Sequence, residues 1–331
     1  MKILASSMTR HAVAVLAKLA MAAILAFATT ASASTSTNAD TKASVSASGE
    51  AKAKANAQIS FDSPSSAMAA FGDAIEKNSE TSLRSLFGED FRKLIPPLGT
   101  QDREAFITAW TQSHSIKPMD AGHAYIAVGN ADWTFPIPLV ESSGGWHFDT
   151  YAGAEEMRLR RIGRNELAVI QTMLAVYDAQ REYAQTPHDG NSLLVYASKL
   201  VSSQGKHDGL YWADAPGQPP SPLGQAFVDA IPSNSRDAGF HGYFFKLLKS
   251  QGTHAPGGAY DYVVRGKLFG GFAVLAWPVE YGSTGIKSFL VSHNGQVYQA
   301  DLGLETAAKA HAMKQFDPGP AWTRVPAGDS E

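Results

Sequence analysis

The chain has 331 residues, of which 44% are hydrophobic and 18% charged, and its formal net charge is -3. This composition is typical of a folded protein and excludes a charge-rich disordered chain. Lys and Arg number 28 against 31 Asp and Glu, so no nucleic-acid partner is expected. The absence of Cys excludes disulfides, thiolate metal sites and a cysteine nucleophile.

The first 33 residues have the organisation of a secretory signal peptide. Lys2, Arg10 and Lys18 precede a short apolar run, Leu19–Phe27, and the pattern A-x-A follows at 31–33. Because a membrane-spanning helix needs about 20 apolar residues, this run is too short for one. We therefore predict a signal peptide over 1–33, cleavage near Ala33, and a periplasmic or extracellular protein without a membrane span. The alternative is a segment that is retained as an anchor.

Residues 34–57 contain Ser, Thr, Ala and Lys but only one large apolar residue, Val45. Such a segment cannot bury enough surface to offset its chain entropy, so it is expected to be a disordered linker.

Residues 58–150 are predicted to form a first α+β module. Asp62 or Ser63 can cap a helix that has Pro64 in its first turn. A second helix is expected over Glu80–Phe87, where Gly88 ends it, and a third begins at Thr100. The expected strands of a small antiparallel sheet are His123–Gly129, Trp133–Val140 and Gly145–Thr150. Pro136 and Pro138 predict that the middle strand lies at an edge or is bulged.

Residues 151–331 are predicted to form a second α+β module. A long helix, Ala154–Gln185, has an apolar seam at Leu167, Ile170, Leu174 and Tyr177, and Gly163 is expected to break or bend it. This seam is expected to pack on a second antiparallel sheet. The expected shorter elements are helices Ser192–Ser203, Pro222–Ala230 and Glu305–Phe316, and strands Gly242–Leu248, Tyr260–Val264, Gly271–Trp277 and Ile286–Ser292. Asn294-Gly295 predicts a type I′ hairpin turn.

Several sequence phrases resemble a known exported bacterial family. They include Trp133-Thr-Phe-Pro-Ile-Pro-Leu-Val140, Arg161-Ile-Gly-Arg-Asn-Glu-Leu167, Asp208-Gly-Leu-Tyr-Trp212 and Gly257-Gly-Ala-Tyr-Asp-Tyr-Val263. The chain is similar to the family called domain of unknown function 2950 from about Phe61 to Trp322. The resemblance implies export and a shared fold, and it implies no activity.

Two further likenesses concern the fold. The stretch from Asn165 to Tyr183 is similar to the exposed half of a pilin helix, and Tyr281-Gly-Ser-Thr-Gly-Ile-Lys-Ser-Phe289 is similar to a phrase in the sheet of pilin-like proteins. This resemblance implies a pilin-like second module. The first module loosely resembles nuclear-transport-factor-2-like modules, which carries no function by itself.

The candidate catalytic groups favour structural interpretations. Asp178 and Glu182 share one helix face, as an acid/base pair would, but an exposed face solvated beside Arg181 is the preferred interpretation. The repeated tripeptides His188-Asp189-Gly190 and His207-Asp208-Gly209 are typical of turns, although His and Asp could also act as ligands or bases. No motif for a metal, a cofactor or a catalytic serine is present, so no catalytic residue, metal or cofactor is assigned.

Aromatic and loop residues of the second module supply the candidate binding residues. We expect a contact surface at Trp212, His241, Tyr281 and Ser283, because aromatic side chains beside Pro and Gly loops offer large contact areas. The alternative is that these residues only pack the loops at the end of the sheet. The preferred function is a non-catalytic binding or assembly module whose partner is an envelope protein or glycan. The alternative function is a hydrolase or transferase acting on cell-envelope polymer.

Overall fold

The computed structural model describes residues 58–97, 99–131, 133–190, 192–213, 215–223 and 239–326. The chain divides into two compact units between Arg158 and Leu159. The predicted signal peptide (1–33) and linker (34–57) lie outside the described residues, as does most of the predicted helix Pro222–Ala230.

The helices of the first unit are α3 (Pro64–Glu76), α4 (Glu80–Phe87), α5 (Phe91–Leu94) and α6 (Thr100–Gln112). Of the two candidate caps, Ser63 is the one used, and its hydroxyl accepts the N–H of Ser66 at 3.2 Å. Gly88 ends α4 with a φ of 93°, a conformation that favours glycine. The three predicted helices are confirmed, and α5 is an additional turn of helix.

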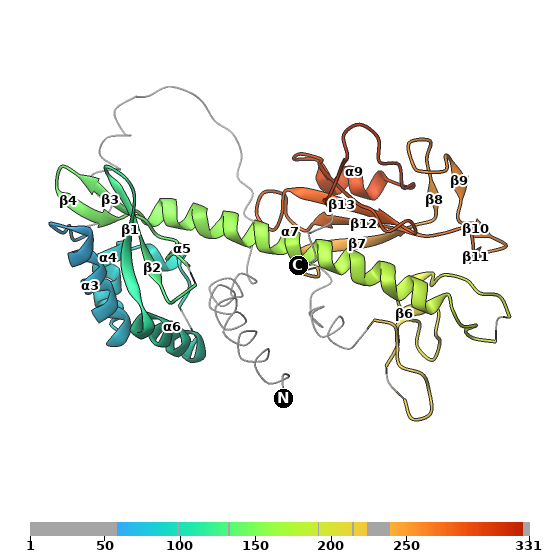
Figure 1. Cartoon of the computed structure of the whole chain (residues 1–331), viewed down its shortest axis with the longest axis horizontal. Coiled ribbons are helices and arrows are strands. Elements are labelled where there is room, and N and C mark those ends of the chain that lie inside the picture. Colours follow the sequence, from blue (N-terminus) through green and yellow to red (C-terminus); the bar gives the residue numbers. More distant parts are fainter. Residues whose placement is uncertain are drawn as a thin grey trace, which may run out of the picture. The chain divides into compact units, whose positions relative to one another are not determined.

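The first sheet is antiparallel in the order β1-β2-β3-β4 and packs against these helices (Figure 1). Its strands are β1 (His114–Asp120), β2 (His123–Val128), β3 (Leu139–Ser142) and β4 (Gly145–Phe148). β1 was not among the predicted strands, because it is almost wholly exposed and has no apolar alternation. The strand expected over Trp133–Val140 begins only at Leu139, and the two prolines before it cannot donate ladder hydrogen bonds.

Aromatic rings form the centre of the first core. The ring of Phe71 is surrounded at centroid distances of 4.5 to 5.9 Å by those of Phe87, Phe106, Trp110, Phe135 and Phe148. Most of these pairs meet edge-on or tilted, as aromatic rings prefer.

The long helix is α7 (Thr150–Tyr183), which continues through Gly163 without the predicted break. The predicted seam is wrong at two of its four positions: Leu167 is 66% exposed and Leu174 is also exposed, whereas Ile170 and Tyr177 pack partly against the second core. The buried positions are Val169, Met173, Val176, Gln180 and Tyr183, which also step by three and four. The predicted seam and the buried positions therefore have the same helical periodicity. The stripe that packs against the sheet is the one that contains the polar residue Gln180.

The second sheet is antiparallel in the order β15-β14-β13-β12-β7. Its strands are β7 (Tyr243–Leu248), β12 (Ala273–Pro278), β13 (Lys287–Ser292), β14 (Val297–Asp301) and β15 (Thr323–Arg324). Val274 and Ala276 of β12 pack with α7, whereas Ala273 and Leu275 pack on the opposite face with Ala310 of α9 (Thr306–Ala312). The second unit is thus a sheet covered on both faces (Figure 1), and the predicted α+β class is confirmed.

The turn between β13 and β14 differs from the predicted type I′ turn. Gly295 has a φ of 79°, but Asn294 is not among the residues with positive φ, which a type I′ turn requires at both central positions. The hairpin itself is present, and its last pair is Val291 with Val297.

The segment after α7 is extended instead of forming the predicted helix Ser192–Ser203. Its backbone joins β-type pairs: β5 (Lys199–Val201) lies parallel to β6 (Gly209–Tyr211), and the Tyr196 N–H donates to Leu268 O at 2.8 Å. The predicted strand Tyr260–Val264 is divided into β9 (Tyr260–Asp261) and β10 (Val263–Val264). They pair separately with β8 (Ser250–Gln251) and β11 (Lys267–Leu268).

Candidate functional site

Three of the four predicted binding residues lie at one end of the second sheet. His241 is in the turn before β7, and Tyr281 and Ser283 are in the loop between β12 and β13. The two segments touch, because a Cβ added to Gly242 would lie 2.9 Å from the Cβ of Thr284. This part of the expected surface is therefore contiguous.

Helix α7 holds that loop in place. Asn165 Nδ2 donates to Thr284 O at 2.8 Å, and Glu166 Oε1 accepts the N–H groups of Ile286 and Lys287 at 2.9 Å. The Tyr281 hydroxyl donates to Asp301 Oδ1 at 3.1 Å, and this bond raises the pKa of the phenol. These bonds fix the loop and occupy the polar groups of Tyr281 and Thr284.

Trp212 lies apart from the other three residues, beside Tyr183 at the last turn of α7. Asn165 and Tyr183 are 18 positions apart on one helix, which corresponds to roughly 27 Å at about 1.5 Å per residue. Trp212 is only 6% exposed, and its indole N–H donates to Pro219 O at 3.0 Å. Its observed role is to pack the proline-rich loop, so the structure does not bring the four residues into one surface.

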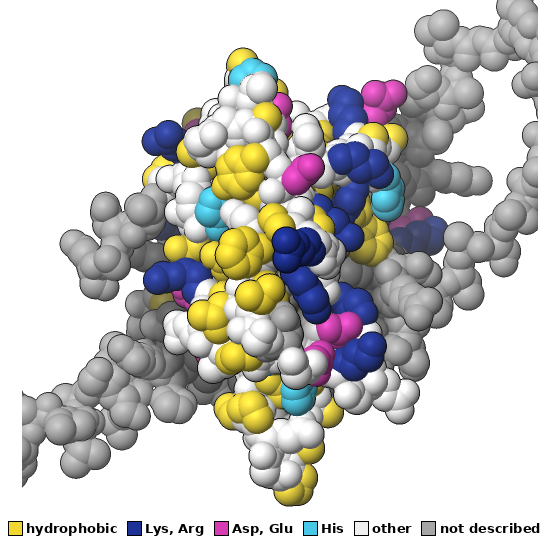
Figure 2. Space-filling model, turned by 90° about the vertical axis from the view of Figure 1, so that its right-hand side faces the viewer, with side chains coloured by type: hydrophobic (Ala, Val, Ile, Leu, Met, Phe, Trp, Pro, Cys, Tyr) yellow, Lys and Arg dark blue, Asp and Glu magenta, His cyan; other side chains and the backbone are white. Residues whose placement is uncertain are grey.

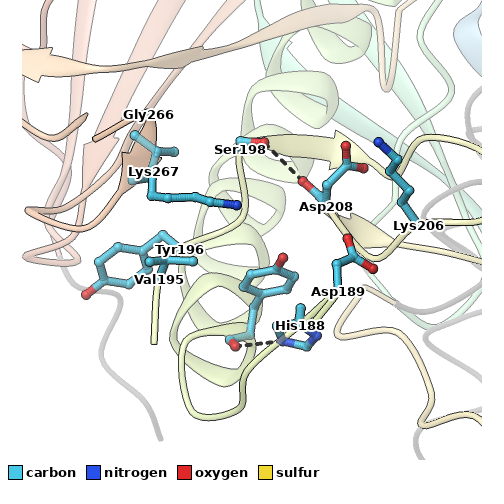
Figure 3. A pocket seen from close by; sticks show the side chains of 11 residues that line it. His188, Asp189, Val195, Tyr196, Ser198, Lys206, Asp208, Gly266 and Lys267 are labelled. Atoms are coloured by element: carbon cyan, nitrogen blue, oxygen red, sulfur yellow. Dashed lines mark hydrogen bonds between the residues drawn. The ribbon is translucent and has the colours of Figure 1, made fainter. Parts of the chain in front are cut away.

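A cavity of about 560 Å³ lies near Tyr183, at the C-terminal end of α7 (Figure 3). Three segments form its walls: the end of α7 with the following turn, the strand-like segments around β5 and β6, and the β10–β11 hairpin. The lining residues are Tyr183, His188, Asp189, Val195, Tyr196, Ser198, Lys206, Asp208, Gly266, Lys267 and Leu268. This volume is within the range of small-ligand sites in proteins.

The two His-Asp-Gly tripeptides meet in this wall. Asp189, at a φ of 51°, accepts the N–H of His207 with both carboxylate oxygens at 3.0 and 3.1 Å. Asp208 accepts Lys199 Nζ at 2.8 Å and the Ser203 N–H at 2.7 Å. Both carboxylates therefore organise turns, as the preferred interpretation of these tripeptides expected.

The pKa values of two wall residues, Asp208 and Tyr183, are shifted by these surroundings. The hydrogen bond from Lys199, aided by those from Ser203, lowers the pKa of Asp208 to about 2. Burial, with the nearby charges of Asp189 and Asp208, raises the pKa of Tyr183 to about 12. The Tyr183 phenol is thus neutral at physiological pH, and it donates to His207 O at 2.5 Å.

The histidine of the first tripeptide is also held in place. The His188 ring stacks on Tyr183 at a centroid distance of 3.8 Å, and its Nε2 lies 2.9 Å from Tyr183 O. Because that carbonyl can only accept, Nε2 carries the proton. The imidazole thereby caps one of the free carbonyls at the end of α7.

Lys206 and Lys267 are the two cationic residues of the cavity wall. In the described ranges, neither ammonium group has an ion pair, whereas Lys199 is paired with Asp208. Figure 3 shows Lys267 extending from the β10–β11 hairpin toward the cavity, with Lys206 on the side of Asp208 and Asp189. Neither lysine was among the predicted site residues, because 61 positions separate them and no motif connects them.

The other candidate groups lie elsewhere. Asp178 and Glu182 are exposed on α7, and the guanidinium of Arg181 lies over the Tyr177 ring at 5.6 Å. Their predicted exposure is confirmed. Within the described ranges, no group of three His, Asp or Glu side chains is arranged to hold a metal ion. The helices of those ranges are also too short or too polar to cross a membrane.

The fold and the cavity define a two-unit α+β protein with a polar, lysine-containing cavity in its second unit. The family model described as a protein of unknown function, DUF2950, matches residues 58–325. The chain belongs to this family, which confirms the expected resemblance. Neither the curated proteins nor the solved structures contain a match to the chain.

Proposed function

We propose that the protein is an exported, non-catalytic binding module that holds a small polar ligand with an anionic group in the cavity of its second unit. The observation that carries the proposal is that Lys206 and Lys267, whose ammonium groups have no ion pair among the described residues, lie together in the wall of a concave site. A carboxylate or phosphate on the ligand would accept hydrogen bonds from these two ammonium groups.

The remaining wall residues support a ligand of mixed character. Val195, Leu268 and the ring of Tyr196 offer apolar contact, and Ser198 and His188 offer polar groups. A concave site that combines apolar contact with a few fixed polar groups is suited to a small polar ligand. An acidic glycan fragment or a short acidic peptide from the cell envelope has the required chemistry.

The state of the two carboxylates favours binding over the alternative of a hydrolase or transferase. Asp189 and Asp208 both accept backbone N–H groups, and Asp208 also binds Lys199. A general base needs a free lone pair aimed at its substrate and a pKa near the working pH. The pKa of about 2 at Asp208 is far from that range.

Export is part of the proposal and rests on residues 1–33. The basic start, the short apolar run and the A-x-A pattern support a cleaved signal peptide and a periplasmic or extracellular location. We also propose that 58–150 and 151–331 are the two modules, and that the long helix on an antiparallel sheet makes the second one pilin-like. Mass spectrometry of the secreted protein should find Ser34 or a near neighbour at the N-terminus. An intact Met1 in the membrane fraction would show an anchored protein instead.

The ligand proposal is tested by calorimetry on the mature chain, residues 34–331. The probes are glucuronate, inorganic phosphate and a Glu-containing dipeptide, with glucose as the neutral probe. We expect at least one anionic probe to bind, and Lys206→Ala and Lys267→Ala each to weaken its binding about tenfold or more, which is the worth of a charge-assisted hydrogen bond. Lys117→Ala, on the exposed strand β1 of the first unit, is the matched control. Binding that both cavity variants retain, or no binding of any anionic probe, would refute the proposal.

A further inference from the structure

Beside the cavity, exposed apolar side chains gather on two neighbouring segments of the second unit. The set, which we call the apolar rim, is Leu193, Leu194, Tyr260, Val264 and Phe269. The isolated antiparallel bridge between Tyr196 and Leu268 brings the two segments side by side, with Leu193 and Leu194 shortly before Tyr196 and Phe269 directly after Leu268. A Cβ on Gly270 would lie 3.6 Å from Tyr260 Cε2, which adds Tyr260 to the same surface.

The exposure of these side chains is large. Leu193 and Leu194 are each 53% exposed and Phe269 is 56% exposed. Single exposed leucines are ordinary, but a contiguous group of large apolar side chains marks an interaction surface.

Cations flank the rim. Arg265 and Gly266 have φ values of 50° and 80°, the geometry of a two-residue type I′ turn, and this turn forms the tip of the β10–β11 hairpin. The tip carries Arg265 and Lys267, and neither has an ion pair in the part of the chain that is described. Asp261, beside Tyr260, is the one exposed carboxylate within β9–β11, so the hairpin region has an excess of positive charge.

The surface view agrees with this arrangement. Figure 2 shows the molecule from the side on which Figure 1 labels β9, β10 and β11, with apolar side chains in a band down the middle and, to its right, Lys and Arg side chains with some Asp and Glu among them. An apolar band beside positive charge is the pattern of proteins that lie on an anionic bilayer, where apolar groups enter the interface and basic groups meet the lipid phosphates.

We propose that the apolar rim docks on the surface of an anionic phospholipid membrane, with Leu193, Leu194 and Phe269 entering the interface and Arg265 contacting headgroups. A lipid surface is favoured over a protein partner because Arg265 is at the hairpin tip and has no ion pair among the described residues. The proposal does not depend on the cavity ligand, since neither the rim residues nor Arg265 line the cavity.

The test is co-sedimentation of the mature chain, residues 34–331, with vesicles of phosphatidylcholine alone and of phosphatidylcholine with 30% phosphatidylglycerol. We expect binding to the anionic vesicles that weakens at high salt, because the attraction is screened. The double variant Leu194→Ser/Phe269→Ser should lose about tenfold or more in affinity through lost apolar burial. Arg265→Glu should lose about fivefold or more, the worth of one basic residue near the surface.

The matched control is Leu167→Ser/Leu304→Ser, which removes two leucines outside the rim that are more exposed than the rim residues, and which should bind as the wild type does. Lys206→Ala, a cavity variant, should also keep vesicle binding, so this proposal and the ligand proposal can fail separately. Equal binding to neutral vesicles, or unchanged binding of the rim variant, would overturn the proposal. So would a dimer in light scattering that the rim variant abolishes, because it would show that the rim contacts a second copy of the chain.

Discussion

Gln180 allows a decisive test of how α7 supports the cavity. This residue is fully buried. Its side-chain amide forms hydrogen bonds with both backbone polar groups of Ala197: Nε2 donates to Ala197 O at 3.0 Å, and Oε1 accepts the Ala197 N–H at 2.8 Å. Ala197 is between Tyr196 and Ser198, which line the cavity. The amide therefore ties the cavity wall to the helix.

The perturbation is Gln180→Glu. The glutamate side chain has the same shape as that of glutamine, but its ability to donate a hydrogen bond depends on pH. A protonated carboxyl group can donate to Ala197 O and accept from Ala197 N, whereas a carboxylate cannot donate and is charged in a buried place. Leaving the buried carbonyl unpaired costs about 1–3 kcal/mol, and an uncompensated buried charge costs about 3–5 kcal/mol. We expect a loss of about 3 kcal/mol in unfolding free energy at pH 7.5.

The pH dependence follows from linkage. A loss of about 3 kcal/mol corresponds to a carboxyl pKa raised by about two units, from about 4.3 in the unfolded chain to about 6.5 in the folded one. Because the folded pKa is raised, the stability is fully present below the unfolded pKa and is lost as the pH rises through the folded value. The variant should therefore be nearly as stable as the wild type at pH 4.

The measurement is urea denaturation at pH 4.0 and 7.5, with hydrogen exchange of residues 193–198 as a local readout. Gln171→Glu, at an exposed position of the same helix, is the control and should change stability little at either pH. If Gln180→Glu costs the same at both values of pH, or costs nothing, the assigned bonds do not hold the cavity wall.

Two further predictions concern the turns and the glycines. The pKa of about 2 at Asp208 is depressed, so its stabilisation is present above about pH 4 and lost as the pH falls through about 2. The difference in urea midpoint between wild type and Asp208→Asn should therefore shrink on acidification, and a constant difference would contradict this. Gly163 has open space around its missing Cβ within α7, so Gly163→Ala should stabilise by about 0.5–1 kcal/mol. Gly285→Ala would place a Cβ against the Tyr243 hydroxyl and should destabilise by about 1–3 kcal/mol, and thermal melts that reverse this order would refute the packing argument.

Local signals in the sequence determined the helix boundaries of the first unit well. Ser63 and Pro64 begin α3, and Gly88 ends α4, because capping bonds and a positive φ depend on one or two neighbouring residues. The central strand β12 was also predicted, since a continuous apolar run is what a strand covered on both faces requires. The family could be recognised from the same kind of information, in contiguous phrases.

The buried stripe of α7 could not be predicted, because Leu167/Leu174 and Val169/Met173 fit one helical period equally well. The tertiary structure decides between them. The extended segment that follows α7 has a buried backbone at Ala197 that needs a partner, and only the stripe that contains Gln180 provides one. A buried glutamine is invisible to any search for apolar periodicity.

The candidate site was also beyond local sequence patterns. The sequence suggested aromatic residues, and His241, Tyr281 and Ser283 do share one end of the sheet, but Trp212 lies at the other end of α7 as loop packing. The cavity instead combines Tyr183, Lys206 and Lys267. Composition, caps and apolar runs are properties of neighbouring residues, so the sequence by itself determined the fold class and most elements. A cavity wall with two unpaired lysines is a property of distant residues, and only the tertiary structure, through the register of Tyr196 with Leu268, decides that they meet.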